Sequence, residues 1–499
     1  MMNDIVLYEK IYKENPDYNV QAAFPEAKRF ALSALGYMYI CRRFDEIEYI
    51  NFEPIYLDTQ RPRIMPKDVN LMSFSFSFDY DFLNILSILE RYKIPFKSKD
   101  RGENFPLIYG GGPVLTANPE PYYEIFDFMT LGDGEDVLKT VTDICRKKLP
   151  KKETLKLLYD VEGVYVPSLP KKEVKKLTCK NIKCITTPIL SEESFFKNTF
   201  VIEIERGCCN MCGFCLASYL NLPIRFISYE EIIEKIDLGL KYTNKIALLG
   251  AMVARHPRFD DICKYIYDKI QNGQNIELSL SSLRVDNISE MAVKTLVASG
   301  QRHSTIAIEA ASERLRRVIN KNITEEQLFN GVKLCKENGL KGLKVYAMIG
   351  IPTETEEDLK EFISLASRLK KTGLEFSFAF STFVPKPHTP FQWCKREDTK
   401  SLKKKQMFLK KEFHKIGIKA EFASPKYDYY QTILSLGSRD LSDALIDIYK
   451  NGRDSSAFKK ALEKFNFEYS LDDELPWDFI KMNPPKEFLK SEYKRLLKY

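Results

Sequence analysis

The sequence predicts an α/β protein made of a doubly wound, flavodoxin- or Rossmann-like N-terminal domain, a central (β/α)6 partial TIM barrel and a mostly helical C-terminal accessory domain. Strand-like and helix-like runs alternate twice, once before residue 150 and again from residue 199, which indicates the first two parts. A polar, helix-like composition after residue 395 indicates the third. The 499 residues therefore divide into 1–150, a linker at 151–198, a core at 199–395 and an accessory domain at 396–499.

The first alternation is typical of a parallel sheet covered by helices on both faces. We expect strands at 19–24, 47–51, 69–74, 106–110 and 126–131, and helices at 27–43, 80–92 and 135–147. Ligands of such sheets bind beyond the carboxyl ends of the strands. Two glycine turns fall at such ends, Gly110-Gly111-Gly112-Pro113 and Gly132-Asp133-Gly134-Glu135. They either let a backbone approach a large ligand closely or only form tight turns.

The second alternation predicts the barrel. Six strand-like runs occur at 199–205, 245–249, 275–280, 304–309, 343–348 and 374–380, with helical patterns between them. Successive βα units of this length form a curved sheet whose functional loops follow the carboxyl ends of the strands. Chemistry is therefore expected in the loops that follow these six runs.

The composition is that of an ordinary soluble protein. The net charge of +7 is modest for this length, no apolar run is long enough to span a membrane, and Met1 to Gln21 is too charged for a signal peptide. Eleven scattered cysteines favour reduced thiols and a local metal site over a disulfide framework. We therefore expect a cytoplasmic protein without a membrane partner.

One stretch, 400–415, is densely basic, with lysines interleaved among apolar residues. This pattern is typical of an amphipathic helix with a solvated face. Contact with RNA or another acidic partner is the alternative interpretation.

Cys208, Cys212 and Cys215 form a C-x3-C-x2-C loop directly after the first barrel strand. A cubane would take four thiolates, so a compact set of three predicts a [4Fe-4S] cluster with one iron open to a substrate or cofactor. Zinc is the competing interpretation, but it requires a fourth nearby ligand and the nearest histidine is His256. Cys209 would point away from the same cluster face.

This loop, with the aromatic Phe214 before its last cysteine, resembles the signature of the radical S-adenosylmethionine (radical SAM) superfamily. Other segments resemble an uncharacterised group of radical SAM proteins with an N-terminal cobalamin (B12)-binding-like domain. These segments are Glu205 to Cys208, Ser281 to Arg284, Ala307 to Arg316, Gly350 to Thr355, Phe383 to Trp393 and Leu475 to Asp478. With the glycine turns, the resemblance covers nearly the whole chain.

The resemblance implies an enzyme with a [4Fe-4S] cluster and S-adenosylmethionine as cofactors. In the superfamily, the amino and carboxylate groups of S-adenosylmethionine bind the open iron. One electron, from a donor such as flavodoxin or ferredoxin, then cleaves a sulfur–carbon bond and releases a 5′-deoxyadenosyl radical. The protein supplies position, electrostatics and exclusion of water.

The resemblance also implies cofactor contacts at the strand ends. Gly250 follows the second barrel strand, where family members bind the methionyl amino group, but the usual glycine-glycine-glutamate is replaced here by Gly250-Ala251-Met252. Ser282 and Arg284 follow the third strand and Glu309 ends the fourth, where the family holds ribose and the methionyl carboxylate. Alternatively, Arg284 and Glu309 form a structural ion pair.

Two further strand ends complete the expected site. Ile349 and Gly350 end the fifth strand, at a turn that packs against adenine in the family, and Phe383 and Val384 follow the sixth strand on another side. His388 lies near this mouth and is the candidate catalytic residue, because its unperturbed pKa is near neutrality and suits a proton carrier. A packed or hydrogen-bonded structural histidine is the alternative.

Cobalamin binding is a separate question. Many B12 domains place a histidine beneath cobalt, whereas the first of the four histidines here is His256, so an N-terminal histidine ligand is excluded. Radical SAM relatives hold cobalamin without such a ligand, so the first domain either binds cobalamin or is vestigial or grips substrate. Bound cobalamin implies methyl transfer to an unactivated carbon with methylcobalamin as relay. Otherwise, hydrogen abstraction drives another radical modification.

Two other functions fit the sequence less well. Methylthio transfer in related enzymes uses a second cluster on three N-terminal cysteines, and residues 1–178 contain only Cys41 and Cys145. A cluster-bearing RNA-binding or assembly protein would use the basic helix, but a structural cluster requires neither an open iron nor the strand-end motifs. The substrate can be a small metabolite, a peptide or RNA, because substrate contacts carry no portable motif.

Overall fold

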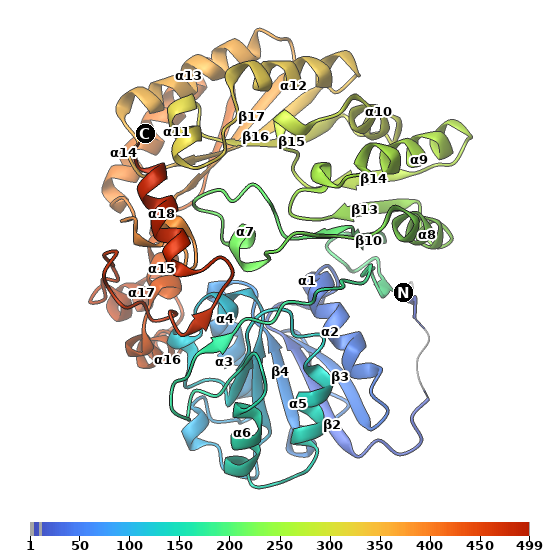
Figure 1. Cartoon of the computed structure of the whole chain (residues 1–499), viewed down its shortest axis with the longest axis vertical. Helices are drawn as coiled ribbons and strands as arrows, with labels where there is room; N and C mark the ends of the chain where they lie inside the picture. Colours follow the sequence, from blue (N-terminus) through green and yellow to red (C-terminus); the bar gives the residue numbers. More distant parts are fainter. Residues whose placement is uncertain (1–3, 9–11, 499) are drawn as a thin grey trace.

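The computed structural model describes residues 4–8 and 12–498 and contains two α/β lobes with helices along one side of both (Figure 1). In the part of the chain so described, no helix has the length and apolar character needed to cross a membrane. The mixed α/β class predicted from the sequence is confirmed.

The first lobe is a six-stranded sheet in the order β3-β2-β4-β5-β6-β7. Its strands are parallel except for β7. In β2 six of the seven residues are buried, as expected for a strand covered on both faces. The order reverses between β2 and β4, which makes the carboxyl ends of these two strands the switch point where ligands of doubly wound sheets bind. The strands are β2 (Tyr18–Phe24), β3 (Ile50–Tyr56), β4 (Leu71–Ser75), β5 (Leu107–Gly111), β6 (Phe128–Thr130) and β7 (Val164–Tyr165).

Two elements of this lobe differ from the prediction. The expected helix 27–43 is broken into α1 (Lys28–Ala31) and α2 (Leu35–Asp45), because the backbone N–H groups of Ser33 and Ala34 bond carbonyls three residues back and not four. The Ser33 hydroxyl bonds the Arg29 carbonyl and Ser194 at this break. The expected strand 47–51 starts only at Ile50. It runs on through Pro54, which β3 tolerates because it is an edge strand. Helices α3 (Phe82–Arg91) and α5 (Leu138–Cys145) lie within the expected ranges.

The segment 151–198 is not a plain connector. Helix α6 (Lys151–Tyr159) buries Leu155 and Leu158 in the core of the first lobe, and β7 adds an antiparallel strand to its sheet. Further on, β8 (Val174–Lys175) pairs with β19 (Ile480–Lys481), and β9 (Ile189–Leu190) pairs with β1 (Ile5–Val6). The first lobe therefore extends past residue 150, because these apolar side chains complete its core.

The second lobe contains all six predicted barrel strands. They form two parallel sheets, β10-β13-β14 and β15-β16-β17-β18, joined by a bridge between Leu283 and Ile306. Strand β18 was not predicted, because its four residues alternate between exposed and half-buried positions, and it carries the sheet beyond residue 395. The strands are β10 (Thr199–Glu203), β13 (Lys245–Leu249), β14 (Glu277–Leu280), β15 (His303–Glu309), β16 (Gly342–Ile349), β17 (Glu375–Thr382) and β18 (Lys419–Phe422).

Helices cover the outer face of the barrel sheet (Figure 1). They are α8 (Tyr229–Leu240), α9 (Phe259–Gln271), α10 (Glu290–Ala298), α11 (Glu313–Val318), α12 (Glu325–Glu337) and α13 (Glu356–Lys370). Apolar residues of the strands and of these helices except α11 form two hydrophobic clusters, one for each barrel sheet. Leu315 and Val318 of α11 belong to a third cluster, against which Phe214 packs.

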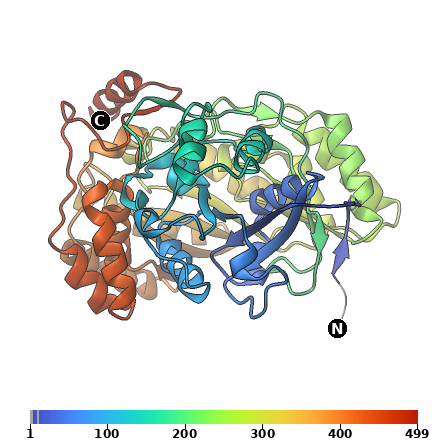
Figure 2. The same ribbon diagram turned by 90° about the horizontal axis from the view of Figure 1, so that it is seen from below.

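The C-terminal region is mostly helical, as predicted, and contacts both lobes. Trp477 and the helices α15 to α17 share one hydrophobic core with the first sheet, whereas α18 reaches the barrel (Figures 1 and 2). The basic segment forms α14, which buries Leu402, Leu409 and Phe413 and uses Lys405 to pair with Glu354, at 2.6 Å. The amphipathic interpretation of that segment is confirmed. The helices are α14 (Thr399–Lys415), α15 (Pro425–Leu436), α16 (Ser442–Lys450), α17 (Ser455–Leu462) and α18 (Lys486–Leu496).

Candidate functional site

The cysteine loop connects the short strand β11 (Glu205–Arg206) to helix α7 (Leu216–Leu220). Cys208 and Cys212 are buried and Cys215 is half-buried, whereas Cys209 is exposed. Gly207 has a φ of 102°, and a Cβ there would lie 2.6 Å from the carbonyl oxygen of Asn221. Glycine is therefore required immediately before the first cysteine.

Side chains from distant segments fix the backbone of this loop. Asn320 donates hydrogen bonds to the carbonyl oxygens of Asn210 and Met211, at 3.2 and 3.0 Å, and the Tyr219 hydroxyl donates to Met211 at 2.9 Å. Asn320 in turn accepts a hydrogen bond from Arg495 of α18, at 3.1 Å. The C-terminal helix thus supports the loop, which the sequence did not predict.

The donor set suits a cluster. Burial raises the pKa of the Cys212 thiol to about 12, so an electropositive group such as an iron cluster is needed to hold it as a thiolate. No three His, Cys, Asp or Glu side chains converge on a single metal ion within 4–8 and 12–498. A cubane instead takes each thiolate on a different iron, which three separated cysteines in one loop can supply.

The ends of the later barrel strands pack against this loop. Phe214 contacts a hydrophobic cluster that includes Ala310 after β15, Met348 of β16 and Phe383 after β17. Gly213 accepts a hydrogen bond from Phe391 at 3.1 Å. The fold thus brings the predicted adenine side of the site to the cysteine loop. The other predicted residues there are Ile349, which is buried, Gly350, which has a φ of 72°, and Val384, which is half-buried.

Two charged residues of the predicted site find other partners. Arg284 pairs with Asp286 at 2.8 Å, and Glu309 pairs with the buried Lys321 at 3.0 Å. The alternative that Arg284 and Glu309 form an ion pair with each other is therefore wrong. Glu309 also has a φ of 63°, which is unusual for a residue with a side chain and typical of functional sites.

Gly250 lies against Glu205, which the sequence interpretation had not singled out. A Cβ on Gly250 would be 2.3 Å from the Glu205 Cγ, so the glutamate side chain occupies the space that a residue 250 side chain would need. One Glu205 oxygen accepts a hydrogen bond from the backbone N–H of Met252. Ser282, in contrast, is exposed.

His388 lies in a buried junction. Burial lowers its pKa to about 3, and its backbone N–H donates to Gln392, which also accepts from Trp477 of the C-terminal region. A histidine that stays neutral at physiological pH cannot cycle as a proton carrier. The geometry therefore favours the structural alternative for His388.

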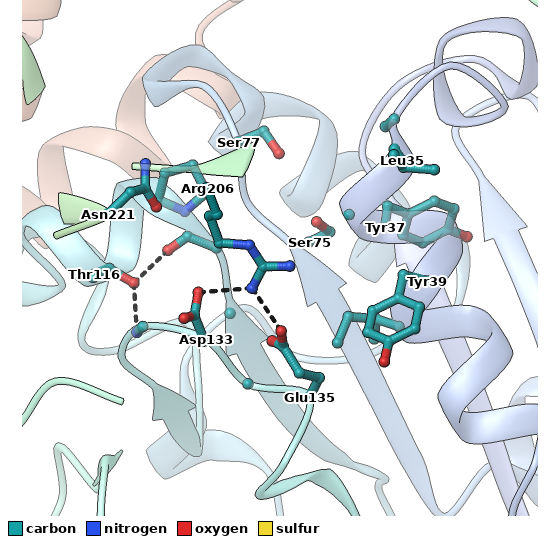
Figure 3. Close-up of a pocket in the computed structure, with 18 of the residues that line it drawn as sticks. Leu35, Tyr37, Tyr39, Ser75, Ser77, Thr116, Asp133, Glu135, Arg206 and Asn221 are labelled. Carbon is teal, nitrogen blue, oxygen red and sulfur yellow. Dashed lines mark hydrogen bonds and ion pairs between the residues drawn. The ribbon is translucent and has the colours of Figure 1, made fainter. Parts of the chain in front are cut away.

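A cavity of about 630 Å³ separates the first lobe from the cysteine loop. Both predicted glycine turns line it, together with the end of β4, the start of α2, Glu205 to Gly207 and Gly250. Thr116 ties the two turns together: its hydroxyl donates to the carbonyl of Gly112 and accepts from the N–H of Gly132, both at 2.9 Å (Figure 3). The cavity thus lies at the switch point of the doubly wound sheet.

Arg206 crosses this cavity wall. Its guanidinium lies 2.6 Å from Glu135 and 3.2 Å from Asp133, both in the second glycine turn (Figure 3). It also lies 2.9 Å from Glu203 of β10. Burial alone would raise the pKa of Asp133, but Arg206 and Arg225 outweigh it and hold that pKa below its ordinary value. The network links the turn of one lobe to the residue two positions before Cys208.

Other residues of the cavity were missed in the sequence. Tyr37 and Tyr39 of α2 and Ser75 and Ser77 at the end of β4 face the same space (Figure 3). The expected ligand crevice at the carboxyl ends of the strands was the only signal that could have pointed to Ser75 and Ser77.

The fold and the site define a class of proteins: a partial barrel that presents a three-cysteine loop to the ligand edge of a doubly wound domain. Two family models match the chain, "Radical SAM proteins, N-terminal" at residues 45–167 and "Radical SAM superfamily" at residues 202–366. A relative from Methanocaldococcus jannaschii, "Uncharacterized protein MJ0966", is 31% identical over 440 residues, which cover 87% of this chain and 91% of the relative. The chain belongs to the radical SAM superfamily and is an enzyme of that superfamily.

Solved structures share the fold at low identity. The radical S-adenosylmethionine methyltransferase TsrM from Kitasatospora setae, with cobalamin and a [4Fe-4S] cluster bound, has a TM-score of 0.51 and 14% identity over 74% of this chain and 75% of its own. The cobalamin-dependent S-adenosylmethionine radical enzyme OxsB, with aqua-cobalamin and S-adenosylmethionine bound, has a TM-score of 0.54 and 17% identity over 73% of this chain and 53% of its own. The superfamily implies a [4Fe-4S] cluster and S-adenosylmethionine for this protein.

Proposed function

We propose that this enzyme is a cobalamin-dependent radical SAM methyltransferase that acts on an unactivated carbon. The observation that carries the proposal is the position of the cavity, between the glycine turns of a doubly wound sheet and the loop with Cys208, Cys212 and Cys215. TsrM and OxsB, which share the fold, are described with cobalamin bound.

The cavity has room for a large ligand, at about 630 Å³, and two glycine turns and several hydroxyl groups line it. Gly112 and Gly132 have φ values of 113° and 106°, and a Cβ on either would meet backbone atoms at 2.6 and 2.2 Å. Both positions therefore require glycine, because the two turns beside the cavity pack directly against the backbone of Phe76 and Leu177. Ser75, Ser77 and Tyr39 add hydroxyl groups that can bond the amides of a corrin periphery.

In this proposal, each part of the chain has a defined task. Cys208, Cys212 and Cys215 would hold the cluster, and the predicted residues at the strand ends would hold S-adenosylmethionine. These residues are Gly250, Ser282, Arg284, Glu309, Ile349, Gly350, Phe383 and Val384. When bound, the cluster and the corrin supply one-electron reduction and methyl carriage. The chain positions them and keeps water from the site. A flavodoxin or ferredoxin would deliver electrons, and the cytoplasm is the expected compartment.

Cofactor uptake and product analysis test the proposal. Anaerobically reconstituted protein should bind hydroxocobalamin with a shifted corrin absorption band. After reduction with dithionite, it should convert S-adenosylmethionine to S-adenosylhomocysteine with methylated cobalamin, or to 5′-deoxyadenosine. Cys212→Ala is the control and should give neither product. Cleavage to 5′-deoxyadenosine without cobalamin binding would leave a radical SAM enzyme of another kind, and the methyl-transfer proposal would be wrong.

A further inference from the structure

Glu205 is a buried carboxylate with an unfilled hydrogen-bonding position. Its side chain is 1% exposed, and one oxygen accepts from the N–H of Met252, but Oε2 has no hydrogen-bond partner among the described residues. Burial raises the pKa of this carboxyl to about 7, and the Met252 N–H opposes the shift only in part. An unpartnered buried carboxyl is costly, so its retention points to a ligand that supplies the missing donor.

Among the residues that the structure describes, no cation pairs with this carboxylate. Arg206, the next residue and a lining residue of the same cavity, is engaged by Glu203, Glu135 and Asp133. Arg206 is thus already surrounded by three carboxylates. A ligand bound beside the cysteine loop would supply the donor that Oε2 lacks.

The backbone around Gly250 is shaped for this carboxylate. Gly250 follows β13, and a Cβ there would lie 2.8 Å from the Glu205 Oε1 as well as 2.3 Å from Cγ. Residue 252 is a methionine, so the loop after β13 has no carboxylate of its own at that position. The glutamate enters the same space from β11 instead.

Glu205 also lies close to the cysteine loop. Glu205 accepts a hydrogen bond from the backbone N–H of Met252, and the Met252 sulfur contacts the Asn210 side chain. The Asn210 amide in turn lies 3.6 Å from the Cys208 Sγ. Met252 and Asn210 therefore link the Glu205 carboxylate to a cluster ligand. An N–H group of a small molecule bound to the open iron is a suitable donor for the free oxygen, Oε2.

We propose that Glu205 accepts a hydrogen bond from the α-amino group of S-adenosylmethionine and so replaces a carboxylate from the loop after β13. The inference rests on the proposed function and deepens it, because it names the residue that recognises one group of the cofactor. A carboxylate suits this task because a hydrogen bond to a charged acceptor is stronger than one to a neutral acceptor. Glycine at 250 leaves room for the Glu205 side chain.

The experiment compares S-adenosylmethionine affinity in reconstituted variants. Glu205→Gln keeps the shape and removes the charge. Glu231→Gln is the matched control, because Glu231 lies in the same lobe and also accepts one backbone N–H, from Cys184 at 3.1 Å, but does not line the cavity. The dissociation constant is measured by anaerobic calorimetry, together with iron content and the change that S-adenosylmethionine causes in the cluster EPR signal.

We expect Glu205→Gln to raise the dissociation constant roughly ten- to a hundredfold, with full iron content and normal cobalamin uptake. Glu231→Gln should bind as the wild type does. Wild-type affinity in Glu205→Gln would overturn the inference, as would a loss of iron that accompanies the loss of affinity. If Glu205→Gln does not fold, Glu205→Asp, which withdraws the carboxylate by one methylene, decides: weaker binding supports the inference and unchanged binding overturns it.

The outcome also separates this inference from the proposed function. If the wild type binds a cluster but no S-adenosylmethionine, the proposed function and the role of Glu205 are both wrong. If the wild type binds and cleaves S-adenosylmethionine and Glu205→Gln does so equally well, only the role of Glu205 falls.

Discussion

Arg206 donates a hydrogen bond to Glu135 at 2.6 Å and thereby joins the strand before the cysteine loop to the second glycine turn of the first lobe. Asp133 and Glu203 surround the same guanidinium. All four side chains are largely buried, at 11–14% exposure, so water does not screen the network. Arg206 therefore helps to hold the cysteine loop in place relative to the cavity, together with Arg225, which pairs with Asp133 at 2.7 Å.

The first prediction concerns Arg206→Gln. The variant leaves the buried carboxylates of Glu135 and Glu203 without their cation, whereas Asp133 keeps Arg225 at 2.7 Å, so we expect a loss of roughly 3–5 kcal/mol in the free energy of unfolding. Arg206→Lys should keep only part of the stability that Arg206→Gln loses, because an ammonium group cannot form the two parallel hydrogen bonds that the guanidinium donates to Glu203. Urea unfolding followed by circular dichroism measures the loss.

Arg258→Gln is the control for this comparison. Arg258 pairs with Asp261 where both side chains are about half exposed, at 50% and 52%, and should change stability by less than about 0.5 kcal/mol. An unfolding midpoint of Arg206→Gln equal to that of the wild type would contradict the importance of the network.

The second prediction follows from the pKa of Glu205. Its folded-state pKa is about 7 against an ordinary value of 4.5, so the folded protein keeps a proton that the unfolded chain releases between these values. The stability from this group is fully present below about pH 4.5 and is lost as the pH rises through 7. Glutamine does not titrate, so the unfolding free energy of Glu205→Gln lacks this loss. Without cofactors, the unfolding free energy of Glu205→Gln should therefore rise relative to that of the wild type by roughly 1–3 kcal/mol as the pH goes from 4.5 to 8. A stability difference that stays constant with pH would show that Glu205 titrates normally.

The third prediction concerns the first glycine turn. Gly112→Ala places a residue with a side chain at a φ of 113°, and its Cβ would lie 2.6 Å from the Phe76 carbonyl oxygen. We therefore expect the free energy of unfolding to fall by at least about 2 kcal/mol and cobalamin to bind more weakly. Gly102→Ala is the control, because nothing lies within 4 Å of the added methyl group. Thermal unfolding and corrin absorbance measure both effects. Equal behaviour of the two variants would exclude a special role for the turn.

The three predicted cluster ligands should differ from Cys209 in their effect on iron content. Alanine at Cys208, Cys212 or Cys215 should remove most of the iron after anaerobic reconstitution, because each thiolate would bind one iron corner. Cys209→Ala should retain it, because Cys209 is exposed. Iron and sulfide analysis with EPR of the reduced protein makes the comparison. Iron loss in Cys209→Ala to the same extent would contradict the assignment.

Much of the fold could be predicted because alternating apolar runs are a local signal. The six barrel strands were predicted within a few residues, whereas β18 was missed because its short polar sequence becomes a strand only beside β17. The cysteine loop could be predicted as well, because the spacing of its cysteines is also a local signal. The partners of Arg284 and Glu309 were not, because Asp286 and Lys321 reach them through loop conformations that spacing does not encode. Glu205 was missed as a single residue since its significance lies in its contact with Gly250.

In the proposed function, one cavity places a corrin opposite the cysteine loop. Anomalous diffraction at the cobalt and iron edges, from anaerobic crystals of the protein reconstituted with cluster and cobalamin, tests it most directly. We predict iron at Cys208, Cys212 and Cys215 and cobalt in the cavity between the Gly112 turn and Arg206. Iron at the cysteines with cobalt absent from this cavity, at saturating cobalamin, would contradict the account.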